Sequence, residues 1–539
     1  MLSLLKNNKN LLVFFYFLLL LSIGLIVYDD YGISIDEDNT RINGFVALRY
    51  IFDLLALDYS DFLSSYPSMS EWNEKGIGFI FDLPTAFIEY IFNISDSRNY
   101  YLLRHLINFI FFYIAIIYFY FLIKNRFNST MFAVLGVSFL YLSPRIFAES
   151  FYNNKDLIFL SLFVIATYYS IKFLDNPSYK NSFLFALTLS LSMGIRITGI
   201  ILALISILIY IIKILRAEKN RKDLTKYFTF FLLIFPILVI IFYPYLWNDP
   251  IKNFIFIFER LGNHPMGTFN FYLGEYISSE NLPWHYTLVW IFVTTPIFYI
   301  ALFISGFFII SRRMFKRLFK IEANESLNDL WRGNNEMKDL IHLFIFILPI
   351  FVVIVFHSTL YDGWRHLYFI YPSFLMISLS GLYFIYIKYF KKKFLRLLII
   401  NLAFIIHISI WMIMNHPFQY VYFNKFASKN FNKFFVMDFW GLSNNQALEY
   451  ILEKDSGDIL VSRFGDSDLN LNKQFLHIKK RSRTKITSIE NSEYVINNFV
   501  FWDGRDKKNK NSLENNFEIY HDIKIDNVTI NRIYKKIDK

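Results

Sequence analysis

Residues 11–28 of the chain read LLVFFYFLLLLSIGLIVY and contain no charged side chain. A helix needs about 20 predominantly apolar residues to cross the hydrocarbon core of a bilayer, so this run predicts a membrane-spanning helix. A removable signal peptide has a shorter apolar core that ends at a cleavage site with small residues. No such site follows Tyr28, and we therefore predict that the run is retained as a membrane anchor.

The composition of the whole chain points the same way. Of the 539 residues, 55% are hydrophobic and only 18% are charged, compared with about 45–50% and 25% in soluble domains. A soluble enzyme, a disordered protein and a nucleic-acid binder all fit this composition poorly, in spite of the net charge of +11. Cysteine is absent, which excludes disulfides, thiolate metal sites and cysteine nucleophiles.

Apolar runs of similar length recur along the chain and predict about eleven membrane helices in total. The further runs lie at roughly 101–123, 129–147, 156–174, 181–195, 197–215, 226–246, 285–311, 340–356, 366–389 and 396–414. Segment 77–94 is also apolar, but Asp82, Pro84 and Glu89 interrupt it. We therefore predict an amphipathic helix at the membrane interface for this segment.

The positions of Lys and Arg predict the orientation, because these residues favour short cytoplasmic loops. With eleven helices and a cytoplasmic N-terminus, the basic clusters around 124–126, 213–226, 312–320 and 388–396 all fall on the inner side. Residues 29–100 then form a long outer loop that is rich in acidic residues. We expect a multi-pass protein of the cytoplasmic (inner) membrane.

Of the 125 residues in 415–539, 36 are charged, whereas only 63 of the preceding 414 are charged. This change predicts a membrane domain over 1–414 and a soluble, extracytoplasmic α+β domain over 415–539. Ser443-Asn444-Asn445-Gln446 has the pattern of a capping box that opens a helix. DILVSRF (458–464) and EYVINNFVF (493–501) are typical of strands.

Charged residues gather where predicted helices meet the outer face of the membrane. The carboxylates are Asp36, Glu37 and Asp156, and the basic residues and histidine are Arg145, Lys155, Arg196, Arg365 and His366. Each alone has an ordinary explanation, as a solvated acid or as a cation that reaches the interface. Together, cations beside carboxylates indicate a site for an anionic headgroup with a base next to it. Arg196 is the most informative, because ionisable groups inside membrane segments are usually functional.

Soluble-enzyme motifs are missing from the sequence. There is no Walker A loop, no G-x-G-x-x-G after a predicted strand and no H-E-x-x-H. A nucleotide-driven pump and a zinc protease are therefore unsupported.

Several stretches resemble one bacterial branch of the GT-C glycosyltransferases, which is related to the protein O-mannosyltransferases and the aminoarabinose lipid A transferase. They are SPRIFAESFYNNKD (143–156), SMGIRITG (192–199), YPYLWNDP (243–250), LPWHYTLVWIFVTTP (282–296), YDGWRHLYFIYP (361–372), NHPFQYVYFN (415–424) and DFWGLS (438–443). The resemblance implies a GT-C-like fold of about 11 transmembrane helices. By position, Asp36 with Glu37 matches the family's catalytic acidic pair, and Asp156 matches its second-loop acid. Relatives often have Glu-Lys-Pro-Pro in the first loop, where this chain has Glu74-Lys75-Gly76-Ile77.

The resemblance implies transfer of a sugar from a polyprenyl-phosphate donor to a hydroxyl of a glycan, lipid or protein acceptor. We expect Asp36 to act as general base, with Glu37 as its orienting or metal-binding partner, and Asp156 to hold the acceptor or share a cation. Arg145, Lys155, Arg196, Arg365 and His366 are the candidate ligands of the donor phosphate. One base with direct displacement predicts inversion at the anomeric carbon. A divalent metal ion is compatible with these ligand types, but no spacing demands it.

A carrier is the main alternative, either a flippase or a secondary transporter of lipid-linked sugars. The interrupted run at Gly194–Gly199 favours it, because transporters bind substrates at broken helices. Most of the charged residues, however, fall at the outer ends of the predicted helices rather than at the midplane. A scaffold protein would explain the soluble domain but not the clustered charges.

Overall fold

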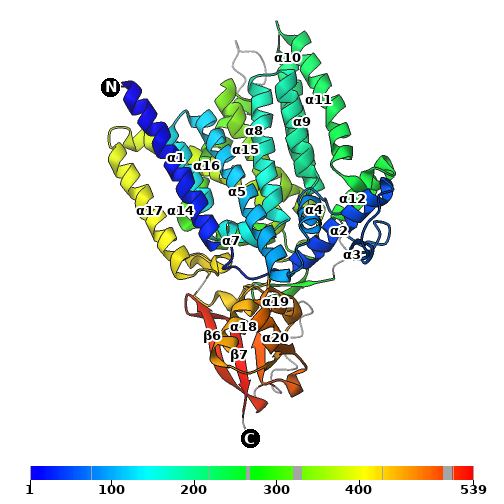
Figure 1. Cartoon of the computed structure of the whole chain (residues 1–539). Coiled ribbons are helices and arrows are strands. Elements are labelled where there is room, and N and C mark those ends of the chain that lie inside the picture. The colour runs from blue at the N-terminus through cyan, green and yellow to red at the C-terminus, as the bar shows by residue number, and fades with distance from the viewer. Residues whose placement is uncertain are drawn as a thin grey trace.

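The computed structural model describes residues 2–74, 76–217, 219–262, 267–319, 330–427, 429–501, 513 and 515–537. A large helical part carries a smaller unit with a mixed sheet at one end, and the N-terminus lies at the opposite end (Figure 1). Among the described residues, nine helices are long and apolar enough to cross a membrane, and a bent pair raises the number to ten. The chain is therefore a multi-pass membrane protein, and the predicted fold class is confirmed.

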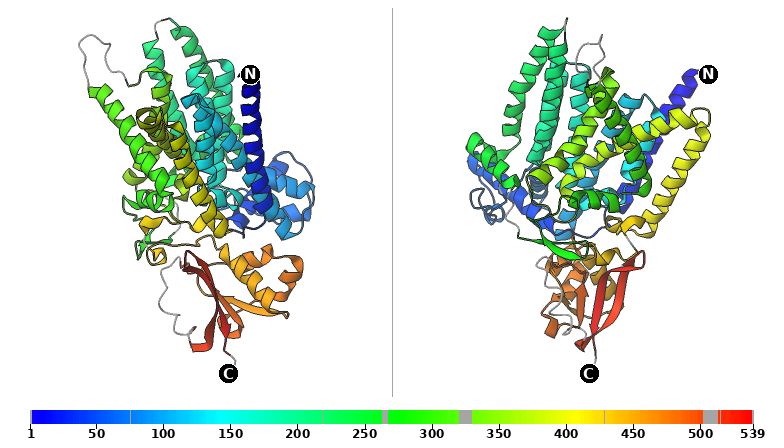
Figure 2. Two further views of the ribbon diagram at one scale, coloured as in Figure 1. Left: turned by 90° about the vertical axis from the view of Figure 1, so that its left-hand side faces the viewer. Right: turned by 180° about the vertical axis from the view of Figure 1, so that it is seen from behind.

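The long membrane helices are α1 (Leu2–Val27), α5 (Ser97–Phe127), α8 (Asp156–Asp175), α10 (Ile200–Arg216), α11 (Arg221–Ile241), α14 (Ile297–Phe319), α15 (Gly333–Val355), α16 (Tyr371–Ile385) and α17 (Phe394–Met414). Shorter helices between them are α6 (Thr130–Tyr141), α7 (Pro144–Tyr152), α9 (Tyr179–Met193) and α13 (Tyr286–Thr294). The 3₁₀ segments η1 (Ile197–Gly199) and η3 (Arg365–Ile370) lead into α10 and α16. The side views show these helices as one bundle (Figure 2).

Three of the predicted membrane helices differ in the structure. Run 129–147 is divided into α6 and α7, which meet at 66°, because Pro144 cannot continue a helix and begins a new one. Run 285–311 is divided at Pro296 into α13 and α14. Run 181–195 corresponds to α9, whose 15 residues fall short of a full crossing. Run 285–311 still provides the membrane helix α14, so the lower number comes from the break at Pro144 and from the short α9.

Four helices lie beside the ends of the membrane helices nearest the sheet (Figure 1). They are α2 (Asp36–Leu54), α3 (Asp61–Ser64), α4 (Asp82–Ile91) and α12 (Pro250–Gly262). The segment predicted as an interfacial helix corresponds to α4, which packs against α2. The hairpin β1 (Phe269–Tyr272) and β2 (Glu275–Ser278) lies at the same level.

The C-terminal unit contains α18 (Ser443–Lys454), α19 (Leu469–Phe475), α20 (Ile478–Arg483), β3 (Ile459–Arg463), β4 (Thr484–Ile486), β5 (Tyr494–Asn497), β6 (Phe517–Ile525) and β7 (Val528–Lys536). The sheet order is β4-β3-β5-β7-β6. Strand β3 is parallel to β4 and β5, and β7 is antiparallel to β5 and β6. Both segments predicted as strands contain one, β3 and β5.

Helix α18 begins at the predicted residue, but the predicted capping box is wrong. The Asp438 carboxylate accepts the backbone N–H groups of Leu442 and Ser443, each at 3.1 Å. An upstream carboxylate therefore satisfies the free N–H groups at the start of this helix. It also fixes the chain between the two parts of the molecule.

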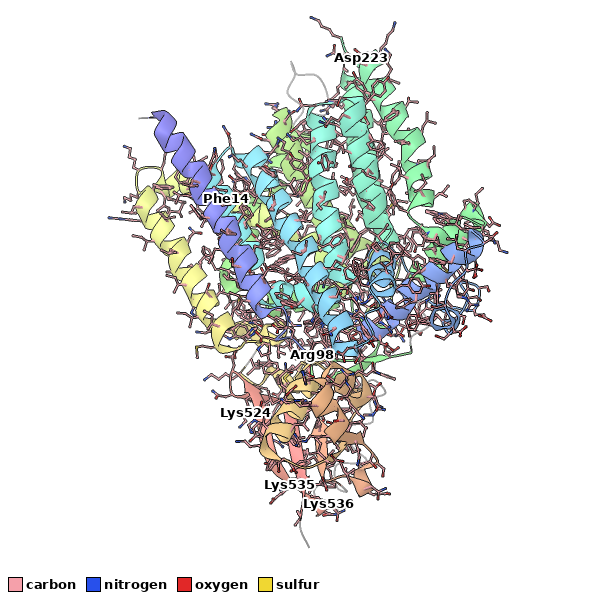
Figure 3. All side chains as sticks on the ribbon, in the orientation of Figure 1. Phe14, Arg98, Asp223, Lys524, Lys535 and Lys536 are labelled. Carbon is pink, nitrogen blue, oxygen red and sulfur yellow. The ribbon has the colours of Figure 1, made fainter. Side chains whose placement is uncertain are left out.

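Residues 415–427 and 429–442 contact both the membrane helices and the sheet unit, where the Asn498 side chain donates to the Asp438 carbonyl at 3.1 Å. The Asn424 N–H donates to the Val293 carbonyl at 2.8 Å, at the end of α13. The sheet unit is attached by Arg481, which pairs with Asp96 at 3.2 Å, and by Arg98, which donates to the Phe475 carbonyl at 3.1 Å. Figure 3 shows Arg98 at this junction.

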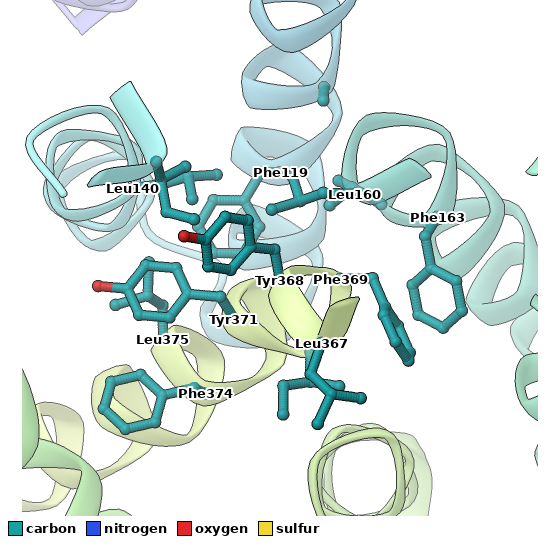
Figure 4. Close-up of a cluster of buried hydrophobic side chains, with 14 of the residues drawn as sticks. Phe119, Leu140, Leu160, Phe163, Leu367, Tyr368, Phe369, Tyr371, Phe374 and Leu375 are labelled. Carbon is teal, nitrogen blue, oxygen red and sulfur yellow. The ribbon is translucent and has the colours of Figure 1, made fainter. Parts of the chain in front are cut away.

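A layer of aromatic and aliphatic side chains lies around η3 and the start of α16 (Figure 4). Phe369 packs between Phe159 and Phe163 of α8, with ring centroids 4.9 Å from each. Tyr371 stacks on Phe374 at 5.5 Å. This packing holds η3 rigidly, and η3 begins with Arg365.

Helices α14 and α16 cross at two glycines, which leads to a first prediction. A Cβ on Gly306 would lie 1.9 Å from the Ile377 carbonyl oxygen, which is backbone and cannot move away easily. We expect Gly306→Ala to force the helices apart and destabilise the fold by about 1–3 kcal/mol, measured as a lower unfolding temperature in detergent. Gly267→Ala is the control, because a Cβ there meets nothing within 4 Å. Equal melting of both variants would contradict the prediction.

Candidate active site

The buried guanidinium of Arg365 is the centre of the site, and three carboxylates from three segments surround it. Its Nη1 donates to Asp36 Oδ2 at 2.8 Å and to Asp156 Oδ2 at 3.4 Å. Its Nη2 lies 3.3 Å from Asp362 Oδ2. Asp36 begins α2, Asp156 begins α8 and Arg365 begins η3, so three element starts meet at this point.

Asp156 links this cluster to a second arginine. Its Oδ1 lies 2.5 Å from Nη2 of Arg196, which occupies the break between α9 and η1. The Asp156 side chain is 1% exposed, whereas that of Arg196 is 23% exposed. Part of the Arg196 guanidinium is therefore accessible to a molecule that binds beside the cluster.

A second layer of polar side chains holds Asp156 in place. Asn153 accepts the Asp156 N–H at 2.9 Å, and its amide donates to Asp156 Oδ2 at 3.2 Å and to Glu149 at 2.7 Å. Glu149 in turn accepts the hydroxyl of Tyr368, which lies on η3, at 2.7 Å. All four residues are buried, so this chain fixes α7, α8 and η3 relative to one another.

Trp440, from the segment that leads to the sheet, covers the other face of Arg365. The guanidinium carbon lies 4.6 Å from the Trp440 ring centroid and 4.8 Å from that of Tyr361. The Trp440 carbonyl accepts the Ile35 N–H at 3.3 Å, one residue before Asp36. The following Gly441 has a φ of +73°, a conformation that glycine adopts without strain.

A cavity of about 200 Å³ opens beside this cluster. Its polar end is lined by Asp36, Lys155, Arg196, Tyr361, Arg365 and His366. Its apolar end lies between Ile201 of α10 and Pro349, Val352 and Val353 of α15. The cavity thus joins a charged head to an apolar groove between two membrane helices.

Electrostatics keep the Asp36 carboxylate ionised. Burial alone would raise its pKa, but Arg365 and Lys155 more than compensate, and the pKa lies below its usual value. Its Oδ2 is bonded to Arg365, and its Oδ1 has no hydrogen-bond partner among the described side chains and backbone. With 24% of the side chain exposed, Asp36 can accept a proton from a molecule in the cavity.

The pKa of the Asp362 carboxyl is shifted in the opposite direction to that of Asp36. Burial raises the pKa of the Asp362 carboxyl to about 6, although Arg365 opposes the shift. Its charge therefore changes between weakly acidic and neutral pH, next to the central arginine.

Glu37 does not share the cavity with Asp36. Its Oε1 lies 2.8 Å from His105 Nε2, and its Oε2 accepts the Ser34 N–H at 2.7 Å. Ser34 to Glu37 has the spacing of a capping box, in which the glutamate reaches back to the start of its own helix. Glu37 therefore anchors the start of α2, and the expected orienting or metal-binding contact with Asp36 is absent from the described contacts.

Arg145 is also turned away from the cavity. It is 3% exposed, and its guanidinium lies 5.5 Å from the Trp290 ring and 4.9 Å from the Phe423 ring. Its Nε donates to the Tyr422 carbonyl at 3.2 Å. These contacts join α7 to α13 and to Tyr422 and Phe423. Arg145 therefore stabilises the packing of these segments and does not line the cavity.

The described residues contain no group of three or more His, Asp or Glu arranged to hold a metal ion. The three carboxylates of the site face Arg365 instead. Their arrangement does not fit a metal centre.

Sequence reasoning missed three positions that complete the site, Asn153, Tyr361 and Trp440, and assigned no role to the neighbouring Asp362. All lie within stretches that carry the family resemblance, which was the available signal. Their contacts join residues far apart in the chain, and Trp440 meets Arg365 across 75 positions.

Residues 84–247 match the family described as Dolichyl-phosphate-mannose-protein mannosyltransferase. This match confirms the predicted resemblance over that part of the chain. It spans α4 to the residues after α11, and includes Lys155, Asp156 and Arg196, whereas Asp36 and Arg365 lie outside it. No curated protein sequence matches the chain.

Solved structures with some similarity are two crystal structures of ArnT from Cupriavidus metallidurans, in the apo state and bound to undecaprenyl phosphate. They have 10% sequence identity and TM-scores of 0.47 and 0.46, and the alignments cover 96% of this chain and 97% and 98% of theirs. The archaeal oligosaccharyltransferase AglB from Archaeoglobus fulgidus, in complex with an inhibitory peptide and a dolichol-phosphate, has 11% identity and a TM-score of 0.45. That alignment covers 90% of this chain and 69% of AglB.

The central position of Arg365 yields a prediction for stability. Arg365→Met leaves Asp36, Asp156 and Asp362 without their shared cation, and removing one partner of a buried ion pair costs about 3–5 kcal/mol. We expect a clear fall in unfolding temperature in detergent. Lys485→Met is the control, because its pair with Asp458 is 60% and 57% exposed and exposed pairs contribute little. A melting temperature equal to that of the control would show that Arg365 does not hold the cluster.

Proposed function

We propose that the chain is a membrane glycosyltransferase that moves a sugar from a polyprenyl-phosphate donor to the hydroxyl of an acceptor. The observation that carries the proposal is the position of Asp36. Its ionised carboxylate faces a cavity that holds cations at one end and continues as an apolar groove at the other. A polyprenyl-phosphate sugar likewise has an anionic phosphate at one end and an apolar prenyl chain at the other. The match of residues 84–247 to a mannosyltransferase family supports this reading.

The apolar end suits the prenyl chain of the donor. Val352 is 37% exposed, and with Pro349 and Val353 it lines the cavity from within membrane helix α15. Ile201 faces them from α10. A hydrocarbon chain placed here stays within the bilayer while its phosphate reaches the polar end.

The polar end suits the phosphate. Cleavage of the sugar–phosphate bond leaves negative charge on the phosphate, and preorganised cations that meet this charge lower the barrier. Arg196 and Lys155 are the best placed, because Arg196 is partly exposed and Lys155 lines the cavity without an ion pair among the described residues. Arg365 and His366 line the same end.

Asp36 acts as general base towards the acceptor hydroxyl, which is a poor nucleophile while it keeps its proton. Asp156 is a weaker candidate, because Arg196, Arg365 and Asn153 occupy its oxygens. Asp36 is the carboxylate that faces the cavity beside the cations, and direct displacement assisted by this one base gives inversion at the anomeric carbon. The cations of the chain receive the phosphate charge, and no step in this scheme requires a metal ion.

We also propose the orientation given by the basic loops. The N-terminus then lies in the cytoplasm, and the sheet unit and the active site lie at the outer face of the cytoplasmic membrane. The acceptor is a glycan, a lipid or a protein that reaches this face.

Replacement of the base tests the proposal directly. Asp36→Asn keeps the size of the side chain but cannot accept a proton, and loss of a general base typically costs about 10²–10⁴-fold in rate. We expect this loss in the transfer of label from a radiolabelled polyprenyl-phosphate sugar to acceptors of a crude envelope extract. Asp38→Asn is the matched control, because Asp38 lies in the same helical turn but accepts the Tyr101 hydroxyl and does not line the cavity.

The same labelled donor, given to the protein in liposomes, distinguishes an enzyme from a carrier. A flippase in liposomes would move the labelled headgroup across the bilayer and form no covalent product, with or without an acceptor. Such a result, or equal transfer by Asp36→Asn and Asp38→Asn, would contradict the proposed function.

Asp362 predicts a pH dependence of donor binding. Because its pKa is raised to about 6, Asp362 is neutral below this pH and negative above it, where it weakens the attraction of Arg365 for the donor phosphate. One added negative charge a few ångströms from the phosphate weakens donor binding by about 1 kcal/mol. We therefore expect donor KM to rise about fivefold between pH 5 and pH 7.5, while Asp36 stays ionised throughout.

In Asp362→Asn this rise should disappear, and donor KM should stay at its low-pH value. The exposed Asp58→Asn should keep the wild-type profile. A profile of Asp362→Asn that follows wild type would show that another group titrates.

A further inference from the structure

An open groove of about 660 Å³ lies between the ends of α9 and α11 that are remote from the sheet unit. Figure 3 shows Asp223, near the start of α11, at the opposite end of the molecule from Lys535 and Lys536. The groove is lined by Tyr179, Arg221, Lys222, Thr225, Lys226, Thr229, Phe230 and Leu233. It is therefore far from the proposed active site, and it lies at the other boundary of the membrane part.

The outer rim of the groove is basic. Lys222 has no ion pair among the described residues. Lys226 lies 3.4 Å from Asp223, and both side chains are 63% exposed, so this pair exchanges easily with a stronger anion. The basic charge of the rim exceeds that of the single carboxylate.

Arg221 is fixed in a different role. Its Nε donates to the Ile214 carbonyl at 3.2 Å, and its Nη2 donates to the Leu215 carbonyl at 3.0 Å. These bonds satisfy the last carbonyls of α10 and hold the start of α11. The two lysines therefore stand on a rigid base.

The inner wall of the groove is apolar and aromatic. Tyr179 is 53% exposed and Leu233 is 64% exposed. The Tyr179 ring meets the Phe230 ring edge-on at 5.2 Å. From the rim inwards, the lining passes from lysine through the hydroxyls of Thr225 and Thr229 to Phe230 and Leu233, as α11 passes into the membrane.

We propose that this groove binds an anionic glycerophospholipid. The two lysines would receive the phosphate, the Thr229 hydroxyl would donate to an ester oxygen, and the aromatic wall would hold an acyl chain, while the Thr225 hydroxyl donates to the Arg221 carbonyl at 2.8 Å. Basic pockets between membrane helices recognise anionic headgroups in this way. A soluble anion would use the lysines but would leave the apolar wall exposed. The wall is therefore the reason to choose a lipid, and the site is independent of the proposed transferase activity.

Lipid retention by the purified full-length chain tests this inference. The protein is reconstituted in nanodiscs of phosphatidylcholine with phosphatidylglycerol, released, and examined by native mass spectrometry for bound lipid. We expect phosphatidylglycerol to be retained in preference to phosphatidylcholine. Each lysine near an anionic headgroup contributes about fivefold in binding, so Lys222→Gln with Lys226→Gln should reduce the preference by more than tenfold.

Two control variants distinguish a site from general basic charge. Lys391→Gln with Lys392→Gln removes the same charge from the exposed loop before α17 and should leave the preference unchanged. Leu233→Gln, which keeps both lysines, should weaken retention of lipid but not of inorganic phosphate. Equal loss in both lysine pairs, no loss in either, or binding of phosphate alone would overturn the proposal.

Discussion

Three carboxylates surround the guanidinium of Arg365 in a place where water hardly reaches it. Asp36, Asp156 and Asp362 lie 2.8, 3.4 and 3.3 Å from its nitrogens, and the side chain is 2% exposed. Isolated charges are costly in such surroundings, so these groups are stable only together. Because each belongs to a different segment, the requirement for charge balance fixes the starts of α2, α8 and η3 relative to one another. Arg196 offsets part of the excess of carboxylate over guanidinium, and the same residue lines the cavity. The interaction that organises the site thus also leaves cationic charge where an anion can meet it.

Much of the architecture around this cluster prevents it from moving. Glu37 holds the first turn of α2 through the Ser34 N–H, and the Trp440 carbonyl holds Ile35, so Asp36 is fixed from both sides. Trp440 in turn depends on Asp438, whose carboxylate accepts bonds from the start of α18. The sheet unit is therefore coupled to Asp36 through a short segment held by backbone hydrogen bonds. A base for proton transfer must lie within hydrogen-bond reach of its substrate, and this coupling limits how far Asp36 can move.

The sequence was sufficient to predict a polytopic helical chain and to select Asp36, Asp156, Arg196 and Arg365, which the structure brings into one network. The reason is physical: carboxylates and cations that are buried near the ends of apolar runs are costly unless they pair with one another. The sequence could not distinguish which of two adjacent charged residues faces the cavity. Asp36 and Glu37 are adjacent in sequence, but successive side chains on a helix point about 100° apart, so only one of them faces the cavity. Arg145 lies in the same stretch as Asp156, yet the turn at Pro144 directs it towards an aromatic cluster. Contacts such as Trp440 on Arg365 leave no periodic signal, because they depend on how distant segments pack.

The position of the cluster at the ends of the membrane helices follows from the two demands on such a site. Under the proposed function, cations act most strongly on a phosphate when water is excluded, which favours depth, whereas the acceptor hydroxyl has to reach Asp36 from outside the bundle, which favours the surface. The cavity meets both conditions, because its apolar end lies within α10 and α15 and its charged end lies at the helix starts beside the sheet unit. The break between α9 and α10 serves this geometry. A continuous helix would direct Arg196 towards a neighbouring helix or the lipid, whereas the extended backbone at this residue lets its guanidinium reach Asp156. The interrupted helix, which also favoured a transporter, is thus explained by the need to place one cation at the boundary.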